Sequence, residues 1–281
     1  MDSSHFTSQI RTMGSKMGTM IDEPFGPALS SIHLRESPLE FVVAQIRFPL
    51  VVSIGEEQFI GPFQELIRQE YSDLRRETET RVEVGPEGVR AAKGGVVWRF
   101  TSETNDWEVA LTPEFLALAT KNYTHREDFL TRLETLVDGL GDWLDLKKTR
   151  RVGVRYIDRV TGNHLDDLPD LVRPEVLGVA GTPLPDAVTL HHALDDCEYR
   201  FADDTALRAR WGCLEPKTTF DPAIDPIDDR SWVLDIDASH GERSFEAAAV
   251  RDQVQLFSDR IYRYFRWAVT DDFLTEFGAE T

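Results

Sequence analysis

Three arginines lie on one face of a single apolar stretch, residues 150–160, which reads RRVGVRYIDRV. Side chains of a β-strand alternate between its two faces. Arg151, Arg155 and Arg159 therefore share one face, and the opposite face is apolar except where Asp158 interrupts it. Guanidinium groups bind carboxylates and phosphates through paired N–H donors. The stretch predicts a central buried strand with a positive face.

A second apolar stretch, residues 39–48 (LEFVVAQIRF), has one face that begins apolar and ends polar at Gln45 and Arg47. If this strand neighbours the first, its polar end meets Arg151 and Arg155 and forms a positive groove for a small anionic ligand. The alternative is that the arginines pair with acidic residues on helices that cover the sheet. The predicted ligand-binding residues are Gln45, Arg47, Arg151, Arg155 and Arg159.

Two carboxylates at alternate positions, Asp235 and Asp237, are the candidate metal ligands. Hard cations such as Mg²⁺ prefer oxygen ligands, so this pair suggests a metal-dependent phosphoesterase or nuclease. The alternative is an exposed strand face in a strongly acidic half of the chain. Neither a glycine-rich phosphate loop, a Gly-x-Ser-x-Gly elbow nor a Cys-x-x-Cys or His-Glu-x-x-His motif occurs, so we expect no cofactor.

The net charge of −19 is concentrated after residue 160. Residues 161–281 contain 25 acidic and 11 basic residues, against 25 and 20 before them. Such a charge disfavours direct binding to nucleic acids and to anionic membranes, and favours a basic protein partner or simply solubility. The chain has no apolar run of 18 residues, its start lacks a signal peptide, and its two cysteines form no disulfide framework. We therefore expect a cytoplasmic protein.

The pattern of elements predicts an α+β fold in which mostly antiparallel sheets pack against a few long helices. Residues 1–36 read as a flexible tail, 37–160 as an N-terminal α+β half, 161–190 as a connection and 191–281 as a C-terminal α+β half. Each half offers strands and helices, so a duplication of the first half is a further hypothesis.

Several local signals set the expected element boundaries. Gly61-Pro62 predicts that the first helix begins near Pro62. Gly94-Gly95 predicts a turn within a meander of short strands over residues 81–111. Thr124 with Glu127 fits a capping box for the next helix, and Thr270 is expected to cap the last one.

The two strand motifs also carry a resemblance. Residues 37–39 (SPL) with 45–49 (QIRFP), and 151–159 (RVGVRYIDR), resemble a family of sporadically distributed bacterial and archaeal proteins of unknown function. The resemblance spans about residues 37–278, and it departs from the family pattern at residues 260–262 (RIY), where a Leu-His pair is usual. It brings no activity to this chain.

Patchy distribution, which the resemblance implies, is typical of accessory genes. We therefore expect a non-catalytic, cytosolic protein-binding protein, such as an antitoxin, an immunity protein or a phage-defence component, whose acidic surface meets a basic partner. The alternatives are the metal-dependent enzyme that uses Asp235 and Asp237, and the binder of a small anionic ligand.

Overall fold

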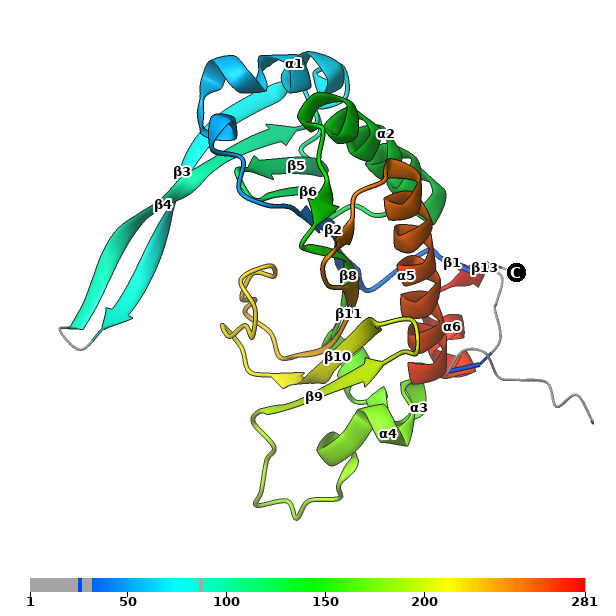
Figure 1. Cartoon of the computed structure of the whole chain (residues 1–281). Helices are drawn as coiled ribbons and strands as arrows, with labels where there is room; N and C mark the ends of the chain where they lie inside the picture. Colours follow the sequence, from blue (N-terminus) through cyan, green and yellow to red (C-terminus); the bar gives the residue numbers. More distant parts are fainter. Residues whose placement is uncertain (1–24, 27–31, 86–87, 281) are drawn as a thin grey trace, which may run out of the picture.

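The computed structural model describes residues 25–26, 32–85 and 88–280, which form an α+β fold (Figure 1). The strands are β1 His33–Leu34, β2 Leu39–Arg47, β3 Asp73–Gly85, β4 Gly88–Thr101, β5 Trp107–Thr112, β6 Phe115–Thr120, β7 Lys148–Thr149, β8 Arg151–Thr161, β9 Ala193–Arg200, β10 Thr205–Leu214, β11 Ser231–His240, β12 Arg243–Ser244 and β13 Ala279–Glu280. The α-helices are α1 Glu57–Ile67, α2 Arg126–Leu144, α3 Leu168–Leu171, α4 Pro174–Leu177, α5 Ala247–Ala268 and α6 Asp271–Glu276. The 3₁₀ helices are η1 Val52–Gly55, η2 Gly162–Leu165 and η3 Gly178–Gly181.

Nine strands form one antiparallel sheet in the order β3-β4-β5-β6-β2-β8-β11-β10-β9. The two strands with the arginine-bearing faces, β2 and β8, are neighbours at the middle of this order. Two short pairs, β1 with β13 and β7 with β12, lie outside the sheet. This confirms the predicted α+β class and the antiparallel sheet.

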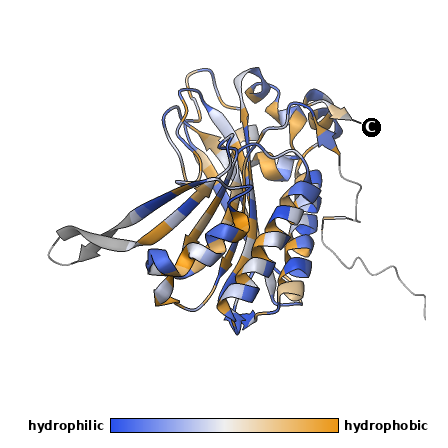
Figure 2. Ribbon diagram, turned by 90° about the horizontal axis from the view of Figure 1, so that it is seen from above, coloured by the Kyte–Doolittle hydropathy of each residue, from blue (hydrophilic) through white to orange (hydrophobic). Residues whose placement is uncertain are grey.

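One face of the sheet is covered by α1, α2 and α5, which pack in a row (Figure 1). The two long helices, α2 and α5, each contain both hydrophobic and hydrophilic residues (Figure 2), as expected of helices that bury one side. The main core lies between them and the sheet and includes Val152 and Val154 of β8, Phe129 of α2 and Phe257 of α5. The core therefore fixes which side of β8 turns away from the helices.

The opposite face of the sheet is covered over part of its area by the connection from β10 to β11, residues 215–230. Ile224 and Phe220 of this connection pack on Ile157 of β8 and Val233 of β11. Elsewhere this face carries charged side chains and a second small apolar cluster, formed by Val97, Ala110 and Ala117 with Val43 and Phe115.

The meander before α2 differs from the expectation. Residues 81–84, 89–92 and 96–100 were predicted to be separate short strands, but they belong to two long strands, β3 and β4. The predicted turn at Gly94-Gly95 is therefore wrong. Both glycines lie inside β4, near the shift of register between Thr78 and Thr80 of β3. Glycine pairs permit a turn, but here the two glycines lie opposite a single residue of β3 and form a bulge in β4 itself.

Two helix starts also differ from the expectation. The first helix, α1, begins at Glu57, so Pro62 lies inside it. The buried stripe of Ile60, Phe63 and Ile67 outweighs the cost of the proline. Helix α2 begins after His125 rather than Thr124, and its N-cap makes no side-chain hydrogen bond, so the predicted capping box is not formed. The cap of α6 is confirmed, because the Thr270 hydroxyl accepts from the Phe273 amide.

Two runs of elements, β2 to α2 and β8 to α5, share a chain order, although the predicted boundary placed residues 151–160 of β8 in the first half. In each run, a central strand is followed by a helical segment, a meander and a long helix, and the last meander strand pairs with the central strand. The duplication stays a prediction. Of the predicted tail, residues 1–24 and 27–31 lie outside the described residues, whereas Phe25 packs edge-on against Tyr199 and Tyr264. Within the described chain, no helix has the length and hydropathy needed to cross a membrane.

Candidate functional site

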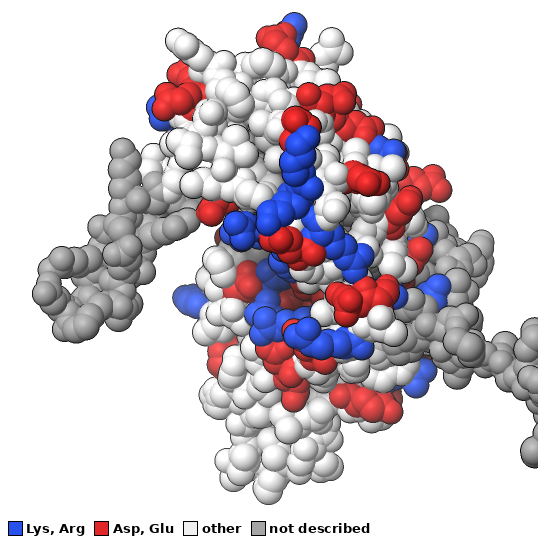
Figure 3. Space-filling view, in the orientation of Figure 1, with Lys and Arg blue, Asp and Glu red and all other residues white. Residues whose placement is uncertain are grey.

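The predicted central strand is confirmed as β8, and its two faces differ as the sequence indicated. Val152, Val154 and Val160 are buried in the main core, whereas Arg151 and Arg155 point to the other side of the sheet. We call this other side of β2, β8, β11 and β10 the arginine face. Figure 3 shows basic and acidic side chains interleaved over the middle of the molecule.

Antiparallel pairing brings the predicted groove residues together on the arginine face. Gln45 of β2 lies opposite Gly153, and Arg47 lies opposite Arg151. On the other flank of β8, Asp237 of β11 lies opposite Arg155. Every residue predicted to bind an anion is therefore on one surface, and so are both predicted metal ligands.

Four charged groups form the centre of this surface. The Arg155 guanidinium donates to both oxygens of Asp235, at 2.7 Å and 3.0 Å, and Arg210 donates to the same carboxylate at 2.7 Å. Asp221, from the 215–230 connection, lies 2.9 Å from Arg155 and 3.1 Å from Arg210. Two cations and two anions make this cluster neutral.

The pKa values agree with this geometry. Burial acts to raise the pKa of Asp221, but hydrogen bonds from Arg155 and from the Ala223 amide hold it below its usual value. Burial acts to lower the pKa of Arg155, but the Asp235 and Asp221 carboxylates raise it. Asp221 and Arg155 therefore stay charged at neutral pH.

The remaining predicted arginines have other partners. Arg151 lies 2.6 Å from Asp237. Arg159 lies 2.8 Å from Glu40 and donates to the Asp225 carbonyl at 2.9 Å. Arg47 stacks over the Phe115 ring, with its guanidinium carbon 5.8 Å from the ring centroid.

The alternative that placed the acidic partners on covering helices is wrong. The partners stand on the adjacent strands and on the 215–230 connection, because the arginine face is turned away from the helices. Asp235 and Asp237 serve as two of these partners. Within residues 25–26, 32–85 and 88–280, no group of three or more metal-ligating side chains could hold a metal ion. The metal site stays a prediction, and an ion there would have to displace guanidinium groups.

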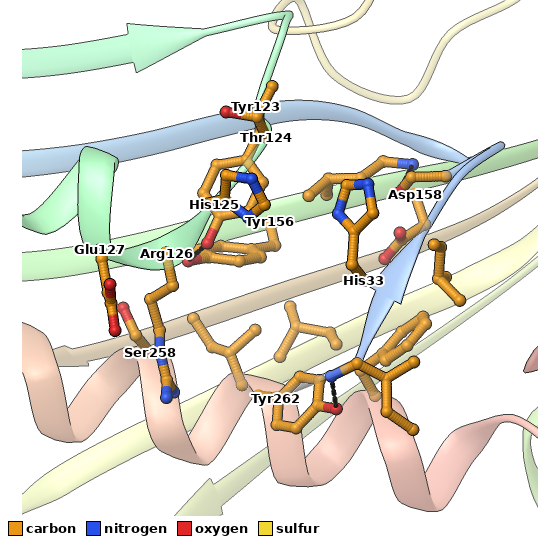
Figure 4. Close-up of a pocket in the computed structure, with 17 residues that line it drawn as sticks. His33, Tyr123, Thr124, His125, Arg126, Glu127, Tyr156, Asp158, Ser258 and Tyr262 are labelled. Atoms are coloured by element: carbon orange, nitrogen blue, oxygen red, sulfur yellow. Dashed lines mark hydrogen bonds between the residues drawn. The ribbon is translucent and has the colours of Figure 1, made fainter. Parts of the chain in front are cut away.

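A second site lies on the helix side of the sheet, where the sequence predicted none. A cavity of about 340 Å³ opens between β8, β1, α5 and the segment that leads into α2 (Figure 4). We call it the Asp158 pocket. Its lining is Ile32, His33, Leu34, Ser37, Leu39, Tyr123, Thr124, His125, Arg126, Glu127, Tyr156, Asp158, Ile236, Ser258, Ile261, Tyr262 and Phe265.

Asp158 has no partner in this pocket. Its side chain is 5% exposed, and its carboxyl group points from β8 into the space in front of α5 (Figure 4). No hydrogen bond or ion pair joins this carboxyl group to another residue in the described part of the chain. Burial, together with the negative charge of Asp235 across the sheet, raises its pKa to about 7.

The other polar groups of the pocket are largely engaged. The hydroxyl oxygens of Tyr123 and Tyr156 lie 3.2 Å apart, and burial raises the pKa of both. The Tyr262 hydroxyl accepts from the Ile32 amide at 2.9 Å, the bond drawn in Figure 4. The Arg126 guanidinium is paired with Asp259 of α5.

Two imidazoles stand at the mouth of the pocket. The rings of His33, on β1, and His125, which precedes α2, have centroids 5.1 Å apart. Both residues are exposed. They narrow the opening above the buried carboxyl group (Figure 4).

The signal that could have found this pocket was present in the sequence. Asp158 is the acidic interruption in the apolar face of the central strand. A buried acid without a counterion is a known mark of a functional site. The residues that form the walls of the pocket could not be predicted from the sequence, because β1, α2 and α5 come from three distant parts of the chain.

Models of known protein families give no match to this chain, and neither do the curated proteins.

Proposed function

We propose that the protein binds a small organic molecule in the Asp158 pocket. One observation carries this proposal: a carboxyl group that is 5% exposed lines a cavity and has no partner among the described residues. Burial of a charged or polar group without a hydrogen-bond partner is costly, and proteins normally avoid it. A bound molecule that donates to Asp158 removes this cost.

The dimensions of the pocket support the same conclusion. Its volume of about 340 Å³ falls at the lower end of the range of roughly 300–1,000 Å³ for small-molecule sites. Apolar and aromatic side chains, including Leu39, Ile261 and Phe265, form much of the lining beside a few polar groups. This mixture is typical of sites that bind small organic molecules.

The arginine face offers less for such a ligand. Arg155 and Arg210 already share Asp235 and Asp221, and Arg151 is paired with Asp237. An anion bound there would compete with these carboxylates. The small anionic ligand predicted from the sequence is therefore less well supported than a ligand of the Asp158 pocket.

The test is retention of a small molecule from an extract. The full chain is incubated with a deproteinised metabolite extract, washed, denatured and analysed by mass spectrometry. The matched control is Thr124→Trp, which adds a large side chain at an exposed residue of the pocket lining. We expect a molecule that the wild type retains and the variant loses. Equal retention by both proteins, or no retention by either, contradicts the proposal.

A protein partner is the second candidate function. It is supported by the charge of −19 and by two exposed apolar side chains close together in the chain, Leu50 at 61% and Val52 at 73% exposed. Isolated exposed apolar residues are common, but paired ones mark contact surfaces more often. In this proposal the protein is an accessory protein, such as an antitoxin, an immunity protein or a phage-defence component, with a basic partner.

Co-purification tests the second candidate. A tagged chain is purified from cells that also express the proteins encoded by the adjacent genes. It should bring down one protein in stoichiometric amount. The variant Val52→Glu should lose it, whereas Val179→Glu, at a residue that is also exposed but lies on η3, should keep it. Recovery of no stoichiometric protein with the wild type contradicts this candidate.

A further inference from the structure

We infer that the ligand of the Asp158 pocket is a small organic cation with two adjacent N–H donors, of the guanidinium or amidinium class. This inference rests on the proposed function, because it assigns the chemistry of the same pocket. It starts from the carboxyl group of Asp158, whose two oxygens have no donor among the described residues.

The geometry of the Asp158 carboxylate determines which donor group of a ligand fits it best. An ionised carboxylate accepts on both oxygens, and the best-matched partner is a planar group with two parallel N–H bonds. The protein itself uses this match on the other face of the same sheet, where Arg155 donates to both oxygens of Asp235. A ligand with one donor would leave one Asp158 oxygen buried and unpaired.

The charge of the pocket selects a cation. Asp158 is a buried acid with no counterion among the residues that the structure describes, and Glu127 adds a second carboxylate to the lining. The cationic lining residue Arg126 is paired with Asp259, so its charge is offset. A net charge of −19 also raises the local concentration of cations near the protein.

The walls suit a flat cation. Tyr156 and Tyr262 contribute aromatic rings, and Phe265 adds a third. Cations bind to aromatic faces with useful energy, above all where water is excluded. Ile236 and Ile261 provide apolar surface for the rest of the molecule.

A matched series of probes tests the charge and the donor pair. Benzamidine, benzamide and benzoate share one ring and differ mainly in the charge of the substituent. Each is titrated into the full chain by isothermal calorimetry at about pH 8, where Asp158, with its pKa of about 7, is mostly ionised. We expect benzamidine to bind, benzamide to bind at least about tenfold more weakly, and benzoate not to bind.

Two variants locate the binding. Asp158→Asn should weaken benzamidine at least about tenfold, because the amide offers one acceptor and no charge. Glu134→Gln removes the same charge from an exposed residue of α2 outside the pocket lining and should change the affinity less than about threefold. Because the probe series uses the wild type, the inference can be judged even if Asp158→Asn does not fold.

The outcomes separate the inference from the proposed function. Benzamide or benzoate binding as well as benzamidine overturns the inference, and so does benzamidine binding that Asp158→Asn leaves unchanged. An extract-derived ligand that is neutral or anionic also overturns the inference, while the proposed function stands. If the extract yields no ligand and benzamidine does not bind, both fail.

Discussion

Two buried aspartates on adjacent strands of the sheet differ in what surrounds them. Asp235 on β11 is 2% exposed and is held by Arg155 and Arg210, whereas Asp158 on β8 is 5% exposed and has no counterion in the described part of the chain. They point to opposite faces of the sheet. Asp235 therefore stabilises the fold through its ion pairs, whereas Asp158 leaves a hydrogen-bond acceptor vacant. The difference arises because the two side chains point to opposite faces of the sheet.

The unpaired Asp158 predicts an unusual dependence of stability on pH. Its pKa is about 7 in the folded protein against 3.8 ordinarily, so between these values the folded state holds a proton that the unfolded chain has lost. Ionisation therefore favours unfolding as the pH rises through this window, by up to about 4 kcal/mol. In Asp158→Asn this contribution is absent. The stability of the variant relative to the wild type should increase from about pH 5 to about pH 8, measured by urea unfolding.

The control for this pH experiment is Glu127→Gln, which removes an exposed acid of the pocket lining. Its stability relative to the wild type should change little over the same pH range. A constant difference between Asp158→Asn and the wild type would show that Asp158 is ionised throughout and has a partner.

The paired aspartates predict a second contrast. Asp235→Asn leaves two largely buried guanidinium groups with one shared carboxylate, and should cost about 3–5 kcal/mol of unfolding free energy. Asp237→Asn, two residues along on the same face, removes the partner of Arg151, whose side chain is 33% exposed, and should cost about 1 kcal/mol. Denaturant unfolding at neutral pH measures both. Similar losses for the two variants would contradict the assigned pairing.

Among the secondary-structure elements, strands with two distinct faces were predictable and the connections between them were not. The sequence pattern of β8 predicted both the position of the strand and its two faces, because the side chains of a strand point alternately to opposite faces. The sequence could not show that Asp221, outside any strand, returns to Arg155 and Arg210, since that contact depends on the path of the 215–230 connection. The long β3–β4 pair was missed because charged residues around Arg75 and Glu77 conceal its alternation.

Gly212 provides a test of how β9 joins the sheet. Its φ is +150°, and a Cβ atom there would lie 1.9 Å from the Ala193 carbonyl oxygen on the paired strand. Gly212→Ala should therefore push β9 away from β10 and cost at least about 2 kcal/mol of stability. Gly241→Ala is the control, because a Cβ there meets nothing within 4 Å. Thermal unfolding of both variants measures the effect, and equal melting temperatures would contradict it.

Across the whole molecule, the two predicted halves meet in a shared sheet and a shared core. Strand β8 of the first half pairs with β11 of the second along most of its length, and α2 packs on α5. The main core includes Leu118 from the first half and Ile236 from the second. The boundaries at 37–160 and 191–281 describe the order of elements along the chain, whereas packing across them makes independent folding unfavourable.

This packing predicts a single cooperative unfolding transition for the full chain. Each half contains three of the six tryptophans, but fluorescence alone cannot separate them, so hydrogen exchange followed by mass spectrometry is the measurement. Peptides from β5 and from β10 should lose protection at the same urea concentration, because unfolding either half uncovers the paired β8–β11 edge and the core that the halves share. Residues 37–160 expressed alone should aggregate, since β8 then lacks β11 and presents an unpaired edge beside an apolar face that α5 no longer covers. Two separate transitions, with a monomeric and protected 37–160 fragment, would instead show that each half is a folding unit and that the β8–β11 pairing joins two independent domains.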